Sequence, residues 1–164
     1  MMTMIIRPIA LPDVPAACRI LNDIIRAGGT TAFETPMDET RFADIYLLGT
    51  DLICCHVVLD GDDQLAGFQW MGRNPKLPTD CADIATFARR DPALRGAGRA
   101  LCAVTKAAAL ALGFSQINAT IRADNVPGLG YYSKMGFVDF TVAKAVPLKD
   151  GTPVDRISKR LALA

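Results

Sequence analysis

The sequence predicts one α/β domain built on a mixed, mostly antiparallel sheet that is flanked by helices. The chain has 164 residues, of which 51% are hydrophobic, so it can enclose one sizeable core. Segments with strand and helix periods alternate along it in the approximate order β α α β β β α β α β β. Neither an internal repeat nor a low-complexity linker interrupts that order. We therefore expect a single domain over residues 1–164.

The chain opens with a predicted strand at 4–9 and a helix that Asp13 caps and Gly28 ends. Apolar residues recur along this helix with its period, on a stripe made of Val14, Ala17, Ile20, Leu21, Ile24 and Ile25. We expect this stripe to face the sheet.

Residues 30–37 have no clear period and predict a loop. Asp38 or Thr40 then caps a second, short helix. Two β-prone runs at 52–59 and 65–71 flank a glycine turn and predict a hairpin.

The second half of the chain alternates strands and helices. The predicted elements are a strand at 83–89, a helix at 98–112, a strand at 117–122, a helix at 126–135 and two closing strands at 138–146 and 155–161. The helix at 98–112 has the clearest period, and its expected stripe is Leu101, Val104, Ala108 and Ala111.

Composition excludes several classes of function. A formal net charge of +1 is too small for the broad positive field on which nucleic-acid binding depends. The five cysteines show neither a disulfide framework nor the spacing of a metal site, and no metal is expected. The N-terminus lacks a long apolar core, and no run approaches the roughly 18 apolar residues of a membrane span. We expect a soluble, cytoplasmic protein with no membrane partner.

The most informative stretch is the turn at 91–100, between a predicted strand and the clearest helix. Gly96 and Gly98 allow close approach of the backbone to a ligand, and the N–H groups that open the helix favour an anion such as a pyrophosphate. Arg95 and Arg99 can add positive charge. The alternative is an ordinary glycine-containing turn. A dinucleotide fingerprint fits poorly, because its third small position falls on Leu101.

Two signatures in the chain resemble those of the GNAT superfamily of N-acetyltransferases. Arg95, Gly98 and Ala100 fill the family's cofactor motif of Arg or Gln, two residues, Gly, one residue, then Gly or Ala. The segment 125–137 resembles the second signature, in which an Asn opens a helix that ends Tyr-x-Lys-x-Gly-Phe. The resemblance implies the GNAT fold, acetyl-CoA as co-substrate and a homodimer.

The same resemblance implies a set of cofactor-binding residues. The end of the strand at 83–89 would present backbone N–H groups to the pantetheine, and the following turn would hold the pyrophosphate. The set is Phe87, Ala88, Arg89, Arg90, Arg95, Gly96, Ala97, Gly98, Arg99, Ala100 and Asn125. The pair Arg89-Arg90 departs from the apolar residues usual at that strand end in the family.

Within the superfamily, the chain looks closest to the phosphinothricin acetyltransferase-like branch, whose members acetylate small amino-acid-like amines. The segments 30–36 and 83–88 carry this narrower resemblance. Relatives have a Glu where Asp83 stands. The substrate class implied is an amine of the phosphinothricin or methionine sulfone and sulfoximine type.

Direct attack of an amine on a thioester needs a base, because an aliphatic amine is mostly protonated at neutral pH. Asp83 is the first candidate, acting directly or through a water. Glu34 is the second candidate, or else a partner for the substrate ammonium. The resemblance assigns Tyr132 as the proton donor to the departing thiolate, and Arg73 could hold a substrate carboxylate. The alternative for each is an ordinary structural or solvent-facing role.

Two other functions stay open from the sequence. One is a GNAT enzyme with another acceptor, such as a polyamine, an antibiotic or a protein N-terminus. The other is a non-catalytic domain that binds acyl-CoA as a sensor.

Overall fold

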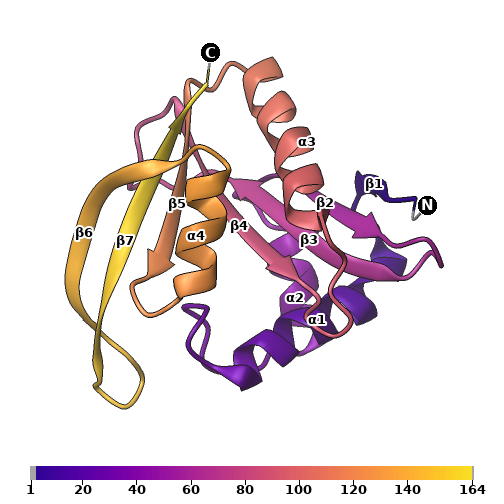
Figure 1. Ribbon diagram of the computed structural model, residues 1–164, viewed down its shortest axis with the longest axis horizontal. Coiled ribbons are helices and arrows are strands. Elements are labelled where there is room, and N and C mark those ends of the chain that lie inside the picture. Colours follow the sequence, from indigo (N-terminus) through magenta and orange to yellow (C-terminus); the bar gives the residue numbers. More distant parts are fainter. Residues whose placement is uncertain (1–2, 164) are drawn as a thin grey trace.

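The computed structural model describes residues 3–163, which form one seven-stranded sheet with the strand order β1-β2-β3-β4-β5-β7-β6 (Figure 1). The strands are β1 (Ile5–Pro8), β2 (Leu52–Leu59), β3 (Leu65–Gly72), β4 (Cys81–Ala88), β5 (Gln116–Arg122), β6 (Val138–Pro147) and β7 (Pro153–Ala162). The β4–β5 pair is parallel and the other five pairs are antiparallel. The expected mixed, mostly antiparallel sheet is confirmed.

The helices cover both faces of this sheet. They are α1 (Val14–Ala27), α2 (Glu39–Tyr46), α3 (Ala97–Ala111) and α4 (Val126–Lys134), with a short 3-10 turn at Leu11–Asp13. One core cluster packs α1 and α2 against β4 through Phe87, and another packs α3 and α4 against β4 through Ile84. Because neighbouring strand residues point to opposite faces, α1 and α2 lie on one face of the sheet, and α3 and α4 on the other (Figure 1).

The six residues of the predicted α1 stripe are all buried, so the predicted sheet-facing side of this helix is confirmed. Asp13 stands at the N-cap position, but its side chain makes no capping hydrogen bond to the helix. Its carboxylate instead accepts hydrogen bonds from the backbone amide of Ala10 at 2.8 Å and from both terminal nitrogens of Arg7 at 2.7 and 2.9 Å. Asp13 therefore joins β1 to the start of α1.

The predicted stripe of α3 is wrong in phase. Leu101 is fully buried, whereas Val104 and Ala108 are half-buried and Ala111 is exposed. The face that packs on the sheet is Ala97, Leu101, Cys102, Thr105 and Ala109. Alanines lie all around this helix, so apolar spacing alone did not identify its buried side.

Two smaller expectations are confirmed. Asp38 caps α2, because its side chain accepts the amide proton of Arg41 at 2.8 Å. β2 and β3 form the predicted hairpin, which turns at 60–64. No helix within residues 3–163 is both long enough and apolar enough to cross a membrane.

Candidate active site

The sheet opens between β4 and β5. The two strands pair only from Cys81 opposite Gln116 to Asp83 opposite Asn118. Beyond Asp83, no pairing joins β4 to β5, and the strands diverge (Figure 1). Backbone groups on that side of β4 are therefore left for another partner, at the place where the sequence predicted contact with a pantetheine.

Asp83 lies at the point where this opening begins. Its carboxylate accepts hydrogen bonds from Nδ2 of Asn118 at 3.1 Å and from Nδ2 of Asn74 at 3.2 Å. Nε of Arg160 donates to Oδ1 of Asn118 at 2.7 Å, which fixes the orientation of that amide. Burial raises the pKa of Asp83 above its ordinary value, although the hydrogen bonds from Asn118 and Asn74 oppose the rise. A carboxylate with a raised pKa is a stronger base than an exposed one.

Tyr132 approaches β4 from α4, on the other face of the sheet. Its side chain is buried, and its hydroxyl shares a hydrogen bond of 2.9 Å with Oγ1 of Thr86. Burial raises the pKa of Tyr132, so the phenol keeps its proton at neutral pH. Asp83 and Thr86 stand three residues apart on β4 and point to opposite faces. A candidate base and a candidate proton donor thus flank the opening from its two sides.

Tyr131 has a different environment, although it lies half-buried beside Tyr132 and burial also raises its pKa. Its hydroxyl donates to the carbonyl oxygen of Gly98 at 2.7 Å and accepts from Nε2 of Gln69 at 3.1 Å. The hydroxyl proton of Tyr131 is therefore already donated to Gly98 and is not available to a leaving group.

The turn at 91–96 leads into α3 with the geometry that an anion site needs. Gly96 has φ = +84°, a conformation that favours glycine, and directs the chain into the helix. Among residues 3–163, no backbone acceptor receives the amide protons of Gly98 and Arg99 in the first turn. Arg95 and Arg99 are exposed beside these amides. Free amides and two cations at a helix start suit a pyrophosphate.

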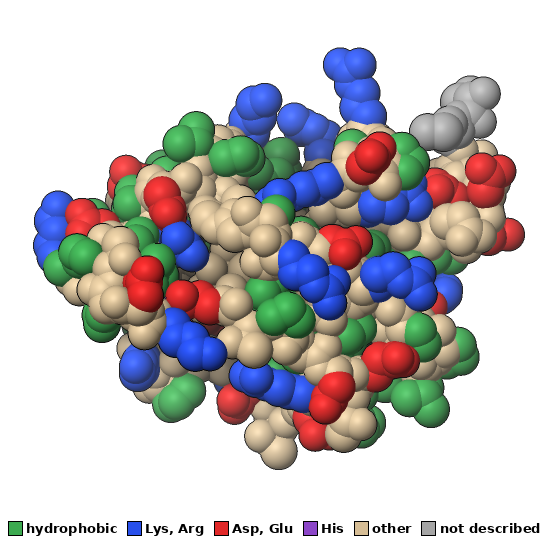
Figure 2. Space-filling view, turned by 90° about the horizontal axis from the view of Figure 1, so that it is seen from below, with side chains coloured by type: hydrophobic (Ala, Val, Ile, Leu, Met, Phe, Trp, Pro, Cys, Tyr) green, Lys and Arg blue, Asp and Glu red, His purple; other side chains and the backbone are tan. Residues whose placement is uncertain are grey.

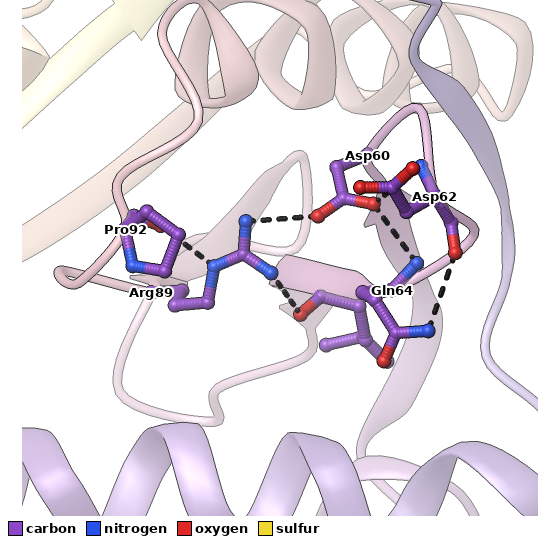
Figure 3. A network of polar contacts seen from close by, with 6 residues as sticks. Asp60, Asp62, Gln64, Arg89 and Pro92 are labelled. Carbon is purple, nitrogen blue, oxygen red and sulfur yellow. Dashed lines mark hydrogen bonds and ion pairs between the residues drawn. The ribbon is translucent and has the colours of Figure 1, made fainter.

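Arg89 uses its guanidinium to hold this turn in place (Figure 3). Nε donates to the carbonyl oxygen of Pro92 at 2.7 Å, Nη2 pairs with Asp60 at 3.0 Å, and Nη1 donates to the carbonyl oxygen of Leu65 at 3.4 Å. The backbone amide of Arg89 donates to the carbonyl oxygen of Ala66 at 2.8 Å, so the N–H group predicted to face the pantetheine is bonded within the sheet. Direct contact between the Arg89 side chain and a phosphate stays a prediction.

The other predicted cofactor residues have varied roles in the fold. The ring of Phe87 packs in an aromatic cluster with Tyr46 and Phe68, and its backbone pairs with Phe68 of β3, so its amide, like that of Arg89, faces β3 and not the opening. Nη2 of Arg90 donates to Oγ1 of Thr30 at 3.1 Å. Asn125 caps α4 by accepting the amide proton of Gly128 at 3.0 Å. Ala88 is exposed at the end of β4, Ala97 is buried, and Ala100 is half-buried in α3.

The loop between α1 and α2 crosses to the far side of the opening. Nδ2 of Asn125 donates to the carbonyl oxygen of Thr30 at 2.8 Å, and Nη1 of Arg122 to that of Thr31 at 3.2 Å. Glu34 is exposed, and its carboxylate accepts the amide proton of Lys149, in the β6–β7 turn, at 2.8 Å. The structure thus places Glu34 in the loop beside the opening, and no hydrogen bond within residues 3–163 links it to Asp83.

A cavity of about 330 Å³ lies near Asp83, which is not itself one of the lining residues. Asn74, which donates to Asp83, forms part of its wall, and Arg73 lies beside Asn74 with its guanidinium over the ring of Phe114 at 5.4 Å. The lining residues are Asp51, Arg73, Asn74, Pro75, Leu77, Pro78, Thr79 and Cys81. The space has the size of a small-molecule site and carries charges of both signs.

Sequence reasoning missed several polar residues of this region. Gln69 and Asn118 are almost fully buried in strands, and Asn74 and Thr86 complete their hydrogen-bond networks. The available signal was a long polar side chain inside an apolar strand, which is rarely buried without a partner. Figure 2 shows the face of the molecule seen from below. Lys and Arg side chains are spread over much of this face, with Asp and Glu side chains between them.

Solved structures with the same fold include three acetyltransferases. A GNAT superfamily phosphinothricin acetyltransferase from Sinorhizobium meliloti, in complex with acetyl-CoA, is 23% identical with a TM-score of 0.83, covering 99% of this chain and 89% of that one. A GCN5-related N-acetyltransferase from Kribbella flavida is 20% identical with a TM-score of 0.84, covering 98% of each chain. A ribosomal-protein-alanine N-acetyltransferase from Brucella melitensis is 20% identical with a TM-score of 0.83, covering 97% of this chain and 99% of that one.

These identities are low, and the three likenesses establish the fold. No curated protein matches the sequence. Residues 19–137, however, match the acetyltransferase (GNAT) family, which is most of the chain and includes both signatures, Asp83 and Tyr132. The chain belongs to the acetyltransferase (GNAT) family.

Proposed function

We propose that the protein transfers the acetyl group of acetyl-CoA directly to the nitrogen of a small amino-acid-like amine. The observation that carries this proposal is the position of Asp83 and Tyr132 on opposite faces of the opening between β4 and β5. A base on one face and a proton donor on the other suit an amine and a thioester that meet in the opening.

The residues of the α3 turn fit the pyrophosphate of acetyl-CoA. The free amides of Gly98 and Arg99 would accept its oxygens, and the exposed cations of Arg95 and Arg99 would balance its charge. Acetyl-CoA supplies the acetyl group as a thioester. The unpaired side of β4 beyond Asp83 would hold the pantetheine by its amides.

Asp83 would remove the proton that the acceptor amine carries at neutral pH, directly or through a water. The freed nitrogen then forms the N–C bond as the C–S bond breaks, and it releases its second proton to solvent, which leaves a neutral amide. Tyr132 would give its phenolic proton to the leaving sulfur, and each group regains its original protonation state from solvent. The carboxylate and the phenol therefore act on different atoms.

The cavity beside Asp83 supports a small acceptor with charges of both signs. Asp83 would face the amine, and Arg73 would pair with the carboxylate of an amino-acid-like substrate. Glu34 is the second candidate for contact with the substrate ammonium, because its loop borders the opening. Acceptors of the phosphinothricin or methionine sulfone and sulfoximine type have this chemistry.

The proposal includes a homodimer in the cytoplasm. β6 is an edge strand, and its large apolar residues Val138, Phe140 and Val142 are 66%, 58% and 49% exposed, which a second copy would cover. The five cysteines are free, which suits a reducing compartment. Multi-angle light scattering of Phe140→Asp beside the unmodified protein tests the dimer, and a dimer that survives this change would argue against β6 as its interface.

The experiment that tests the activity is release of CoA thiol from acetyl-CoA with a panel of acceptors. The panel contains phosphinothricin, methionine sulfone and sulfoximine, amino acids, polyamines and peptides. We expect turnover with at least one amino-acid-like amine and its loss on N-methylation to a tertiary amine, which has no proton to release after attack. Turnover with peptides or polyamines alone would replace the proposed substrate class.

A further inference from the structure

We propose that Thr86, held by Gln69, orients the hydroxyl proton of Tyr132 toward the leaving group, at the end of a hydrogen-bond chain that begins at the carbonyl of Gly98. This inference rests on the proposed role of Tyr132 as proton donor. It adds Gln69 and Thr86 to the site as positioning residues.

The direction of the chain is set at its first link. A backbone carbonyl can only accept a hydrogen bond, so the hydroxyl of Tyr131 must donate to the carbonyl oxygen of Gly98, at 2.7 Å. That hydroxyl has one proton, so its oxygen can only accept from Gln69, at 3.1 Å. Gln69 is therefore required to present its amide nitrogen, and not its oxygen, to this cluster.

Gln69 passes the direction on to Thr86. Its Nε2 carries two protons, one for the oxygen of Tyr131 and the other for Oγ1 of Thr86 at 2.9 Å. Gln69 is 0% exposed, and its Oε1 has no partner within residues 3–163. If the Gln69 amide were flipped, Oε1 could accept from the Thr86 hydroxyl. It would then also face the hydroxyl oxygen of Tyr131, and two acceptors would repel each other because Tyr131 has no second proton to donate. The unpaired oxygen is the consequence of the orientation that Tyr131 imposes.

The last link determines which proton stays free. Because Oγ1 of Thr86 accepts from Gln69, the Thr86 hydroxyl can give its own proton to the oxygen of Tyr132, at 2.9 Å. The proton of Tyr132 then has no protein acceptor within the described chain, and it is available to a sulfur in the opening. If Tyr132 instead donated to Thr86, the Tyr132 proton would be held by Thr86 and the Thr86 proton would have no acceptor.

The hydrogen bond from Thr86 also makes Tyr132 a better proton donor. Burial raises the pKa of Tyr132, and the bond from Thr86 acts in the opposite direction, because a donated proton stabilises the phenolate. Loss of that bond would both release the Tyr132 hydroxyl and weaken its acidity. The hydrogen-bond chain begins at Gly98, in the first turn of α3, so it connects the proposed phosphate site to the proposed proton donor.

The test compares two substitutions of Thr86 that differ by the hydroxyl. Thr86→Val keeps the branched shape and removes the hydroxyl, whereas Thr86→Ser keeps the hydroxyl. We expect Thr86→Val to lower kcat by about tenfold with an unchanged KM for acetyl-CoA, and Thr86→Ser to recover most of that loss. Tyr131→Phe, which removes the link that orients Gln69, should also lower kcat. Circular dichroism confirms that each variant is folded.

A double-mutant cycle with Tyr132→Phe separates this inference from the proposed function. If Thr86 acts through Tyr132, Thr86→Val adds no further loss of kcat to Tyr132→Phe. A normal kcat for Thr86→Val beside a slow Tyr132→Phe would overturn the orientation by Thr86 and leave Tyr132 as the donor. A normal kcat for Tyr132→Phe would overturn both. Additive losses in the double variant would show that Thr86 acts independently, which would also overturn the inference.

Discussion

The ring of Tyr131 lies directly against Gly98. A β-carbon on Gly98 would come within 2.6 Å of Cε1 of Tyr131, closer than real contacts allow. The same tyrosine donates to the carbonyl of that glycine. The absence of a side chain at 98 is therefore required by the protein's own packing, and a substitution there affects more than a phosphate site.

Gly98→Ala is expected to displace Tyr131 and to lower the free energy of unfolding by about 1–3 kcal/mol, as overpacking does. Chemical denaturation measures this change. Gly130→Ala in α4 is the matched control, because a β-carbon there meets no atom within 4 Å. The control should raise the free energy of unfolding by about 0.5–1 kcal/mol, since alanine favours the helix. Equal stability of the two variants would contradict the packing role of Gly98.

Arg89→Gln should weaken acetyl-CoA binding without slowing the chemical step. The side chain joins Pro92 to Asp60 and so fixes the turn that leads to the free amides of α3. We expect KM for acetyl-CoA to rise about tenfold, which corresponds to about 1.4 kcal/mol, while kcat stays within twofold. Steady-state kinetics measures both constants. Asp62→Asn, an exposed neighbour in the β2–β3 turn, should change neither, and a fall in kcat alone for Arg89→Gln would refute this role.

Asp83→Asn tests the base through its pH profile. In the unmodified enzyme, kcat/KM should fall as pH drops through the pKa of Asp83, at a pH above the ordinary range of an aspartate because burial raises that pKa. Asp83→Asn lacks this limb, and its activity should grow with the free-amine fraction toward the amine pKa of about 10. Tyr132→Phe should show no such recovery. If the two profiles of Asp83→Asn and the unmodified enzyme run parallel while Glu34→Gln shows the recovery, the base is Glu34.

No cysteine is expected to carry the acetyl group. Burial raises the pKa of all five thiols, that of Cys55 to about 12, so they stay protonated and are poor nucleophiles at neutral pH. Initial-rate plots should therefore intersect, as they do for a ternary complex. Cys54 is a half-buried cysteine in β2, where it pairs with Met71 of β3, and the Cys54→Ala variant should remain active. Parallel plots, or an acetylated cysteine found by mass spectrometry, would disprove direct transfer.

Asp13→Asn should destabilise the fold in a pH-dependent way. The hydrogen bond from Arg7 lowers the pKa of Asp13 despite burial, and the amide of Ala10 adds to this. Because the folded-state pKa is below the unfolded one, this stabilisation is present above the unfolded-state pKa and is lost as pH falls through the folded-state pKa. We expect a loss of about 1–3 kcal/mol in the free energy of unfolding at neutral pH, shrinking in acid.

Denaturant titrations at several pH values measure that difference. Asp23→Asn is the control, because the Asp23 carboxylate is 69% exposed and lies 3.5 Å from Arg26, which is 61% exposed. Its effect should stay below about 0.5 kcal/mol at every pH. A loss for Asp13→Asn that persists in acid would show that its charge is not the stabilising feature.

Local sequence patterns determined the elements, their order and the two signatures of the acetyltransferase family. β2 was predicted with its observed bounds, and the α1 stripe was identified residue by residue, because period and turn residues are local properties. The fold-level arrangement followed from that order and from the resemblance. The same patterns placed Asp83 and Tyr132 among the candidates.

Contacts between distant segments decided the rest. Gln69 and Tyr131 are 62 residues apart and Asp83 and Asn118 are 35 apart, yet each pair shares a hydrogen bond. The buried side of α3 depended on which face the sheet accepted, since alanines surround that helix. Burial and hydrogen-bond direction arise only when such segments pack together, so the sequence determined which chemical groups are present, and the tertiary structure determined which proton each group can give.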